Sequence, residues 1–239
     1  MKSPQLTFRP KGLLINGQWQ EPSDGRSLTT MNPSTGETLG EVPLATTADV
    51  DRAVQAAAAA FADDWGRMGT VERAGLMEQL ADRIAEHRAE LGMMDCLDSG
   101  NVLRGMEADV DWTVQALRYF AVLITELKGE TFSREPGHLN LTRRQPYGVV
   151  GKINPFNHPF RFCAEKAAAA LAAGNTVVIK APEQAPLSSL RFAELCQGIL
   201  PPGVVNVLTG DGTTGSALVR HPLVRRIGFV GSVETGQII

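Results

Sequence analysis

The hydrophobic residues of this 239-residue chain follow one spacing before Pro146 and another after it. After Pro146, short β-branched runs alternate with Ala- and Leu-rich segments of helical length. Four such runs occur, at 148–153, 175–179, 204–208 and 226–230. This alternation predicts βαβ units, and therefore an open, mostly parallel α/β sheet with helices on both faces.

The first part of the chain is predicted to contain a hairpin followed by a helix. Asn16-Gly17 lies between apolar flanks and predicts a tight hairpin, because both turn positions need positive φ. Thr46 and Asp49 can form a capping box, and apolar residues recur at helical spacing from Val50 to Phe61. We therefore expect an amphipathic helix from Thr46 onward.

Two longer helical patterns come next, one carrying Leu76, Leu80 and Ile84 and one running from Val110 to Ile124. Polar and apolar residues then alternate between Lys128 and Tyr147, which predicts an edge strand or a protruding hairpin. The chain accordingly divides into residues 1–126, with the first hairpin and the helices, an extended arm at 127–147, and a parallel βαβ region at 148–239.

Composition excludes several classes of protein. Hydrophobic residues make up 43% of the chain, and the formal net charge is −3 without a long run of either sign. Nothing here predicts binding to nucleic acid or to a membrane surface. No apolar run is long enough for a signal peptide or a bilayer span, so we expect a cytoplasmic protein. The three cysteines have no metal-site or disulfide spacing and are expected to be reduced structural thiols.

One glycine-rich segment matches a dinucleotide-binding pattern. Residues 210–215, Gly-Asp-Gly-Thr-Thr-Gly, follow a predicted strand and open a predicted helix, as the G-x-G-x-x-G fingerprint requires. The fingerprint also needs an acid about 20 residues further on. Glu234 lies near that distance, but in what is predicted to be the first turn of the next helix. A purely structural strand-to-helix turn explains the glycines equally well.

Four motifs in order are more informative than any one of them. They are Ile153-Asn-Pro-Phe-Asn-His-Pro159, Lys180-Ala-Pro-Glu183, the Gly210–Gly215 segment, and Phe229-Val-Gly-Ser-Val-Glu-Thr-Gly236. All fall at the carboxyl ends of predicted parallel strands, where ligands of open α/β sheets bind. Together with Ile15-Asn-Gly-Gln-Trp19 and Asn32-Pro-Ser-Thr-Gly-Glu37, this set resembles the NAD(P)-dependent aldehyde dehydrogenase superfamily over the whole chain.

The resemblance implies a catalytic role for Asn157. In that family the corresponding asparagine donates its side-chain amide to the oxyanion of the thiohemiacetal, and a preorganised neutral donor suits a developing alkoxide. An asparagine before His158-Pro159 also serves simply as a turn former. Lys166 falls where many members carry a lysine proposed for proton relay, although a lysine among small residues can instead extend from a helix face to solvent.

The resemblance also implies a cofactor. Lys180 and Glu183 match the family pair that grips the adenosine ribose, and a carboxylate there disfavours a 2′-phosphate, so NAD is expected over NADP. The alternative is two solvated charges in a loop at the end of a strand.

The remaining cofactor contacts are also carried over from the family. Gly231 and Ser232 match the Gly-Ser that faces the pyrophosphate, and Phe229 opens the same motif; Ser232 also fits a simple helix N-cap. Gly212 would lie beside the adenine. Residues Ile153, Asn154, Pro155 and Phe156 would line the nicotinamide side, where Asn154 and Phe156 depart from the commoner small aliphatic residue and Trp.

The family's chemistry oxidises an aldehyde to a carboxylate through a Cys nucleophile and a Glu base, which lie in Gly-Gln-x-Cys and Glu-Leu-Gly-Gly segments. Neither segment occurs here. We therefore expect a truncated, cofactor-binding half that works as a homo-oligomer or with a complementing C-terminal half. A non-catalytic nucleotide-binding or interaction module is the alternative. A third possibility is an ordinary Rossmann reductase, which predicts that Glu234 rather than Glu183 binds the ribose.

Overall fold

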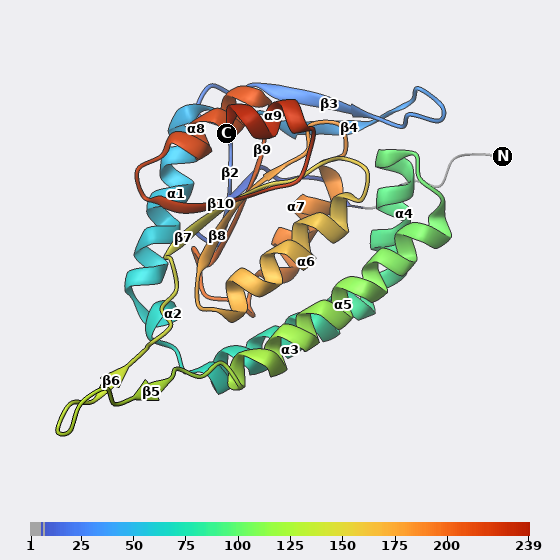
Figure 1. Cartoon of the computed structure of the whole chain (residues 1–239). Helices are drawn as coiled ribbons and strands as arrows, with labels where there is room; N and C mark the ends of the chain where they lie inside the picture. Colours follow the sequence, from blue (N-terminus) through green and yellow to red (C-terminus); the bar gives the residue numbers. More distant parts are fainter. Residues whose placement is uncertain (1–5, 7) are drawn as a thin grey trace.

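The computed structural model describes residue 6 and residues 8–239, and a six-stranded sheet lies at its centre (Figure 1). Its strand order is β10-β7-β8-β9-β1-β2. The four predicted strands are present as β7 (Val149–Ile153), β8 (Thr176–Ala181), β9 (Val205–Thr209) and β10 (Val224–Phe229). They pair in parallel, β10 with β7, β7 with β8 and β8 with β9. The predicted open, mostly parallel sheet is therefore confirmed.

The first hairpin extends this sheet. Strands β1 (Leu13–Ile15) and β2 (Gln18–Gln20) are antiparallel, and β1 also pairs with β9. Asn16 and Gly17 form the tight turn with φ values of 54° and 70°, as the sequence predicted. The backbone N–H of Asn16 donates to Oδ1 of Asn206 on β9 at 2.9 Å, so the turn is fastened to the parallel strands.

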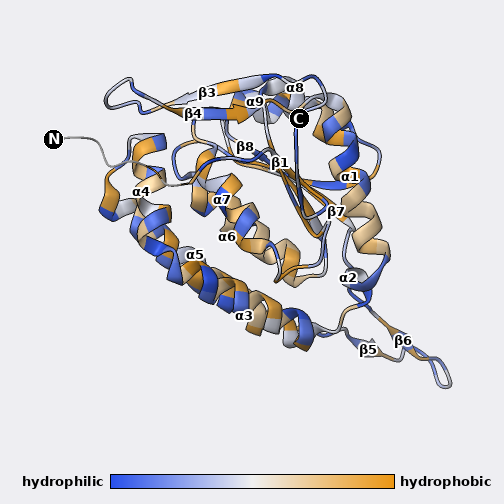
Figure 2. Cartoon of the chain, turned by 180° about the vertical axis from the view of Figure 1, so that it is seen from behind, coloured by the Kyte–Doolittle hydropathy of each residue, from blue (hydrophilic) through white to orange (hydrophobic). Residues whose placement is uncertain are grey.

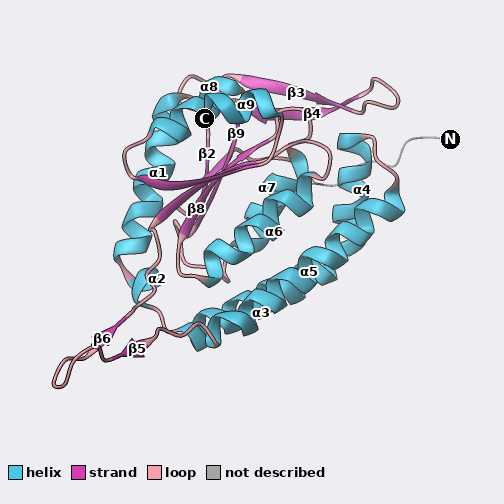
Figure 3. Cartoon of the chain, in the orientation of Figure 1, coloured by secondary structure: helices cyan, strands magenta, loops and turns pink. Residues whose placement is uncertain are grey.

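Helices cover both faces of the sheet (Figure 3). On one face, α6 (Pro159–Ala172) and α7 (Leu187–Cys196) pack in a core that includes Val150, Val177 and Val207. On the other, α1 (Thr47–Ala62) and α8 (Gly212–Arg220) pack in a core with Val149 and Val178. Neighbouring positions of one strand thus contribute to opposite cores, as expected for a strand buried on both faces.

The predicted capping box begins α1. The Thr46 side chain accepts a hydrogen bond from the backbone N–H of Asp49, and Oδ2 of Asp49 accepts one from the backbone N–H of Thr46 at 2.8 Å. A short helix, α2 (Asp64–Arg67), follows α1.

A further helical layer packs outside α6, with hydrophilic residues along α3 and α5 between hydrophobic ones (Figure 2). It consists of α3 (Thr70–Glu86), α4 (Arg88–Ser99) and α5 (Leu103–Thr125). The sequence predicted two long helices here, whereas the structure has three. The break falls at His87, where φ is −102° and ψ is 16°, and the ring Nδ1 lies 2.8 Å from the carbonyl oxygen of Arg83.

Two small hairpins lie outside the main sheet. Strands β3 (Ser27–Met31) and β4 (Thr38–Pro43) form one. The other, β5 (Thr131–Phe132) with β6 (Asn140–Leu141), protrudes from the rest of the chain, as predicted for the stretch between Lys128 and Tyr147 (Figure 1). Its side chains are exposed, including Leu139 and Leu141. A short helix, α9 (Val233–Ile238), ends the described chain. Among residue 6 and residues 8–239, no helix has the length and apolar character needed to cross a bilayer.

Candidate functional site

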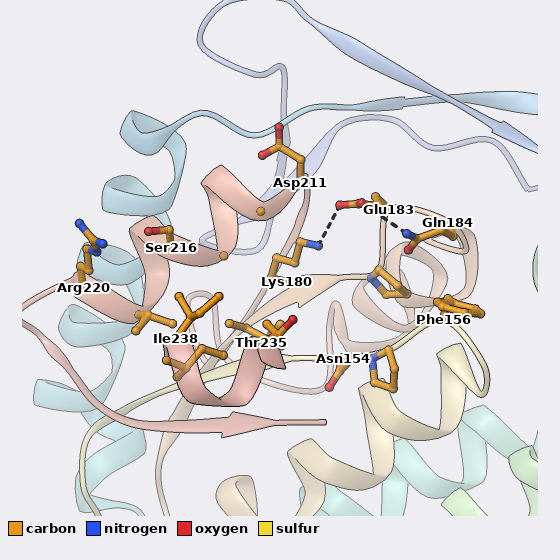
Figure 4. Close-up of a pocket in the computed structure, with 17 residues that line it drawn as sticks. Asn154, Phe156, Lys180, Glu183, Gln184, Asp211, Ser216, Arg220, Thr235 and Ile238 are labelled. Carbon is orange, nitrogen blue, oxygen red and sulfur yellow. Dashed lines mark hydrogen bonds and ion pairs between the residues drawn. The ribbon is translucent and has the colours of Figure 1, made fainter. Parts of the chain in front are cut away.

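A cavity of about 320 Å³ lies where β7, β8 and β9 end, between the loops that follow these strands and helices α8 and α9 (Figure 4). This volume falls within the range of small-molecule sites. Of the predicted cofactor residues, the structure brings seven together in its lining: Ile153, Asn154, Pro155, Phe156, Lys180, Glu183 and Gly212. Three segments that are far apart in sequence therefore meet at one site.

Lys180 and Glu183 form an ion pair at this cavity. Lys180 is the penultimate residue of β8 and only 7% exposed, and its Nζ lies 3.5 Å from Oε2 of Glu183. Burial lowers the pKa of the Lys180 ammonium, and the carboxylates of Glu183 and Asp211 offset part of that effect. Gln184 donates to the other carboxylate oxygen of Glu183 at 3.3 Å. The pair thus presents both a donor and an acceptor to the cavity.

Asp211 is a lining residue that our sequence analysis did not single out. It is the N-cap of α8, and its side chain accepts hydrogen bonds from the backbone N–H groups of Thr213 at 2.8 Å and Thr214 at 3.3 Å. Burial alone would raise the pKa of Asp211, but these N–H groups and Lys180 hold it below the usual value. An Asp directly before a predicted helix is an N-cap signal, and it could have identified this residue.

This cap changes the interpretation of the G-x-G-x-x-G segment. The carboxylate of Asp211 accepts from the N–H groups of Thr213 and Thr214, the second and third residues of α8, so these two groups are not free to bind a pyrophosphate. A Cβ at Gly210 would lie 2.1 Å from Oγ1 of Thr214, so packing alone requires glycine there. Glu234 lies in the first turn of α9, as predicted, and not in the cavity lining. The ordinary Rossmann interpretation therefore finds two of its N–H groups occupied and its acid outside the lining.

Gly212, unlike Gly210, has open space where a side chain would lie. A Cβ built there would meet nothing within 4 Å, so no neighbouring atom of the described chain requires a glycine at this position. Gly212 also lines the cavity. The open space beside it suits close approach of a ligand.

A buried amide beside the cavity lacks a partner. Asn154 is 5% exposed, and its Nδ2 has no hydrogen-bond partner within the described part of the chain. An unsatisfied buried donor costs about 1–3 kcal/mol. The same lining includes the apolar side chains of Ile153, Pro155 and Ile238. A ligand with polar groups between apolar rings, such as a dinucleotide, fits this combination.

The segment 229–232 and α9 lie at the edge of this site. Ser232 is the N-cap of α9 and accepts a hydrogen bond from the backbone N–H of Thr235 at 3.1 Å. A Cβ at Gly231 would lie 2.4 Å from the ring of Phe229, so a larger residue there would require this ring to move. Phe229, Gly231 and Ser232 lie outside the cavity lining, whereas Thr235 is part of it.

Asn157 lies on the exposed loop between β7 and α6, outside the cavity lining. Asn101, in the loop before α5, and Asp109, on α5, contact this β7–α6 loop. The Asn101 side chain donates to the carbonyl oxygen of Asn157 at 2.5 Å, and Nδ1 of His158 lies 2.5 Å from Oδ2 of Asp109. Sequence reasoning missed both contacts.

Lys166 is half-buried on α6, and its Nζ lies 2.9 Å from Oε1 of its neighbour Glu165. Its ammonium also lies 5.9 Å from the centre of the Phe162 ring. The lysine is therefore engaged within its own helix and does not reach the cavity lining.

None of the three cysteines resembles a nucleophile. Cys163 and Cys196 are buried, and burial raises the pKa of the Cys163 thiol to about 12 and that of Cys196 well above its ordinary value. Cys96 is partly exposed on α4. The lining of the cavity contains none of them. The expectation of structural thiols agrees with this burial.

Comparison with known proteins identifies the family. Residues 19–239 match the aldehyde dehydrogenase family over nearly the whole chain. The chain belongs to the aldehyde dehydrogenase family. This confirms the resemblance drawn from the ordered motifs. The chain is 45% identical to aldehyde dehydrogenase tropH of Talaromyces stipitatus over 233 residues, which cover 95% of the chain and 44% of that relative. It is 40% identical to rat retinaldehyde dehydrogenase 3, covering 95% of the chain and 45% of the relative.

Solved aldehyde dehydrogenases share the fold. The NAD⁺ complex of the enzyme from Bacillus cereus superposes with a TM-score of 0.94 at 40% identity, over 98% of this chain and 48% of that one. HpcC from Thermus thermophilus gives a TM-score of 0.94 at 37% identity, over 98% and 46% of the two chains. This aldehyde dehydrogenase chain thus spans less than half the length of these relatives.

Proposed function

We propose that this aldehyde dehydrogenase chain binds NAD in the cavity at the ends of β7, β8 and β9, as part of an enzyme that oxidises an aldehyde to a carboxylate. The observation that carries this proposal is the Lys180–Glu183 pair in the cavity lining. An ammonium and a carboxylate 3.5 Å apart match the vicinal hydroxyls of a ribose, which both donate and accept hydrogen bonds. The Bacillus cereus relative, described as an NAD⁺ complex, supports the choice of cofactor.

Each residue has a proposed task at this site. Glu183 accepts from the ribose hydroxyls and disfavours a 2′-phosphate, because two negative charges would meet. Lys180 donates to one hydroxyl. The cavity-side amide of Asn154 supplies a further polar contact, and Phe156 packs against the nicotinamide side. Gly231 and Ser232, which lie outside the cavity lining, are proposed to contact the pyrophosphate because of their positions in the family motif.

Asn157 is proposed to stabilise the negative oxygen that develops during aldehyde oxidation. Asn101 and the Asp109–His158 contact hold the backbone of the loop that carries this side chain, which favours a fixed position for the donor. Bound NAD would supply the hydride acceptor for the reaction. Lys166, which pairs with Glu165, is proposed to take part in proton relay because of its position in the family pattern.

The nucleophile and the base are proposed to come from outside these 239 residues. Two of the three thiols are buried with raised pKa values and none lines the cavity, so none is a candidate. The alternative is a non-catalytic nucleotide-binding module. Aldehyde turnover by these residues joined to a segment that carries Glu-Leu-Gly-Gly and Gly-Gln-x-Cys would favour the enzyme, and NAD binding without turnover would favour the module.

Calorimetric titration of the purified chain with NAD and NADP tests this proposal, together with an assay of NAD reduction in the presence of simple aldehydes. We expect binding of NAD, weaker binding of NADP, and no turnover by the chain alone. A Lys180→Met variant should bind NAD more weakly, whereas Arg118→Met, which removes an exposed charge on α5, should not change binding. Folded wild-type protein that binds neither cofactor would contradict the proposal, and turnover lost on mutation of a cysteine would contradict the assignment of the nucleophile.

A further inference from the structure

Two carboxylates, not one, accompany Lys180 at the cavity. Glu183 reaches it from the loop after β8, and Asp211 interacts with it from the N-terminus of α8. Figure 4 shows the side chains of Glu183 and Asp211, both residues of the cavity lining, on the same side of the Lys180 ammonium. One cation therefore faces two anions.

The backbone of α8 holds the Asp211 carboxylate in place. Its Oδ1 accepts from two consecutive N–H groups, those of Thr213 and Thr214. Leaving this position would break two charge-assisted hydrogen bonds. The negative charge is therefore a permanent feature of the cavity wall.

The other cation in the lining lies apart from this group. Arg220 lines the cavity from the last turn of α8, and in Figure 4 its side chain extends beyond Ser216, away from Glu183 and Asp211. The charges that face the Lys180 region thus sum to a net negative value.

We propose that Asp211 is a second determinant of cofactor choice, which acts with Glu183 to exclude a phosphate on the 2′-hydroxyl of the adenosine ribose. The inference rests on the proposed binding of the ribose by Lys180 and Glu183. A 2′-phosphate carries close to two negative charges at neutral pH and would approach both carboxylates with a single ammonium to balance them. The unmodified ribose of NAD brings no such charge.

The variants Asp211→Asn and Asp211→Ser test this inference, because Asn and Ser are good N-caps that keep the start of α8 while they remove the charge. The measured quantity is the ratio of the Kd for NADP to the Kd for NAD, obtained by calorimetry on the intact chain. We expect each variant to lower this ratio by about three- to ten-fold at low ionic strength, and by less in high salt. Asp51→Asn, which removes an exposed charge outside the cavity lining, is the matched control and should not change the ratio.

The outcomes separate the two proposals. If the folded wild type does not bind NAD, the proposed function fails and this inference fails with it. If the wild type binds NAD but the ratio is the same in Asp211→Asn, Asp211→Ser and wild type, only the role of Asp211 is overturned. A ratio that falls equally in Asp51→Asn would also overturn it, because the effect would then be one of net charge.

Discussion

The carboxylate of Asp98 on α4 accepts a hydrogen bond from the backbone N–H of Leu187, the first residue of α7, at 2.9 Å. Asp95, one turn earlier on α4, accepts in the same way from the N–H of Phe160 in the first turn of α6, at 3.0 Å. Neither α6 nor α7 has a side-chain cap of its own. One helix therefore caps two others, and both of these begin after loops that line the cavity.

Replacing Asp98 with Ala should lower the free energy of unfolding by about 1–3 kcal/mol, because the N–H of Leu187 and the hydroxyl of Thr30 lose their acceptor. Asp98→Asn keeps an acceptor oxygen and should cost less. Urea denaturation measures both. The exposed Asp82, which pairs with Arg118, is the control, and Asp82→Ala should change stability by no more than about 0.5 kcal/mol. Equal losses for Asp98→Ala and Asp82→Ala would contradict the role of the buried cap.

The free energy of unfolding should depend on pH through the titration of the Asp95 carboxyl. Burial raises the pKa of its carboxyl from 3.8 to about 7, since the hydrogen bonds that it accepts offset only part of the loss of water. Because the folded pKa is raised, the folded state binds more protons than the unfolded state between these values. This contribution to stability is fully present below about pH 4 and is lost as the pH rises through 7.

Asp95→Asn removes this titration but keeps an acceptor for the N–H of Phe160. The stability of the wild type relative to this variant should therefore fall by about 2–3 kcal/mol between about pH 5 and pH 8. Thermal or urea unfolding over this pH range checks the difference. Two parallel stability curves would show that Asp95 does not titrate there.

Gly210 and Gly212 should respond in opposite ways to the same substitution. Gly210→Ala places a methyl group against Thr214 and should destabilise the fold by about 1–3 kcal/mol. Gly212→Ala meets open space and should leave stability within about 0.5 kcal/mol of wild type, but its methyl group should weaken NAD binding. Calorimetry and urea unfolding on both variants test this contrast. Unchanged NAD affinity in Gly212→Ala would argue against close approach of the cofactor.

The protruding β5–β6 hairpin should contribute to self-association. Leu139 is 71% exposed and Leu141 65% exposed, so the hairpin presents two apolar side chains to solvent. A Leu139→Ser, Leu141→Ser double variant is expected to sediment more slowly than the wild-type chain at the same concentration, without a change in its unfolding midpoint. An identical sedimentation profile for variant and wild type would contradict a role for the hairpin in assembly.

Local patterns predicted much of the fold, whereas contacts between distant segments were not visible in the sequence. The Asn16-Gly17 turn, the Thr46–Asp49 capping box and the four parallel strands each depend on residues close together in the chain. The caps from α4 join residues 65 and 89 positions apart, and no periodicity encodes such pairs. Helix α4 was not predicted, because the first helical pattern rests on Leu76, Leu80 and Ile84, which all precede the break at His87.

In the candidate site, too, positions along the chain were predicted, whereas the contacts of individual side chains were not. Order along the chain placed Lys180, Glu183 and Gly212 at neighbouring strand ends, and they do line one cavity. Asp211 was not predicted because the G-x-G-x-x-G pattern places no requirement on the residue between its first two glycines, although an Asp directly before a helix is an N-cap signal. That Phe229 packs against Gly231 could not be predicted, since the direction of a side chain in a turn depends on the backbone conformation.

The most direct test of the central claim is a calorimetric titration of NAD into Glu183→Gln and Glu234→Gln, with folded wild-type chain that binds NAD as the reference. Losing a charged hydrogen bond to a ribose hydroxyl costs about 1.5–3 kcal/mol, so Glu183→Gln should bind NAD at least about ten-fold more weakly and discriminate less against NADP. Glu234→Gln should bind like the wild type. Equal affinity of Glu183→Gln and wild type, together with a large loss in Glu234→Gln, would contradict the proposed site and favour an ordinary Rossmann mode of binding.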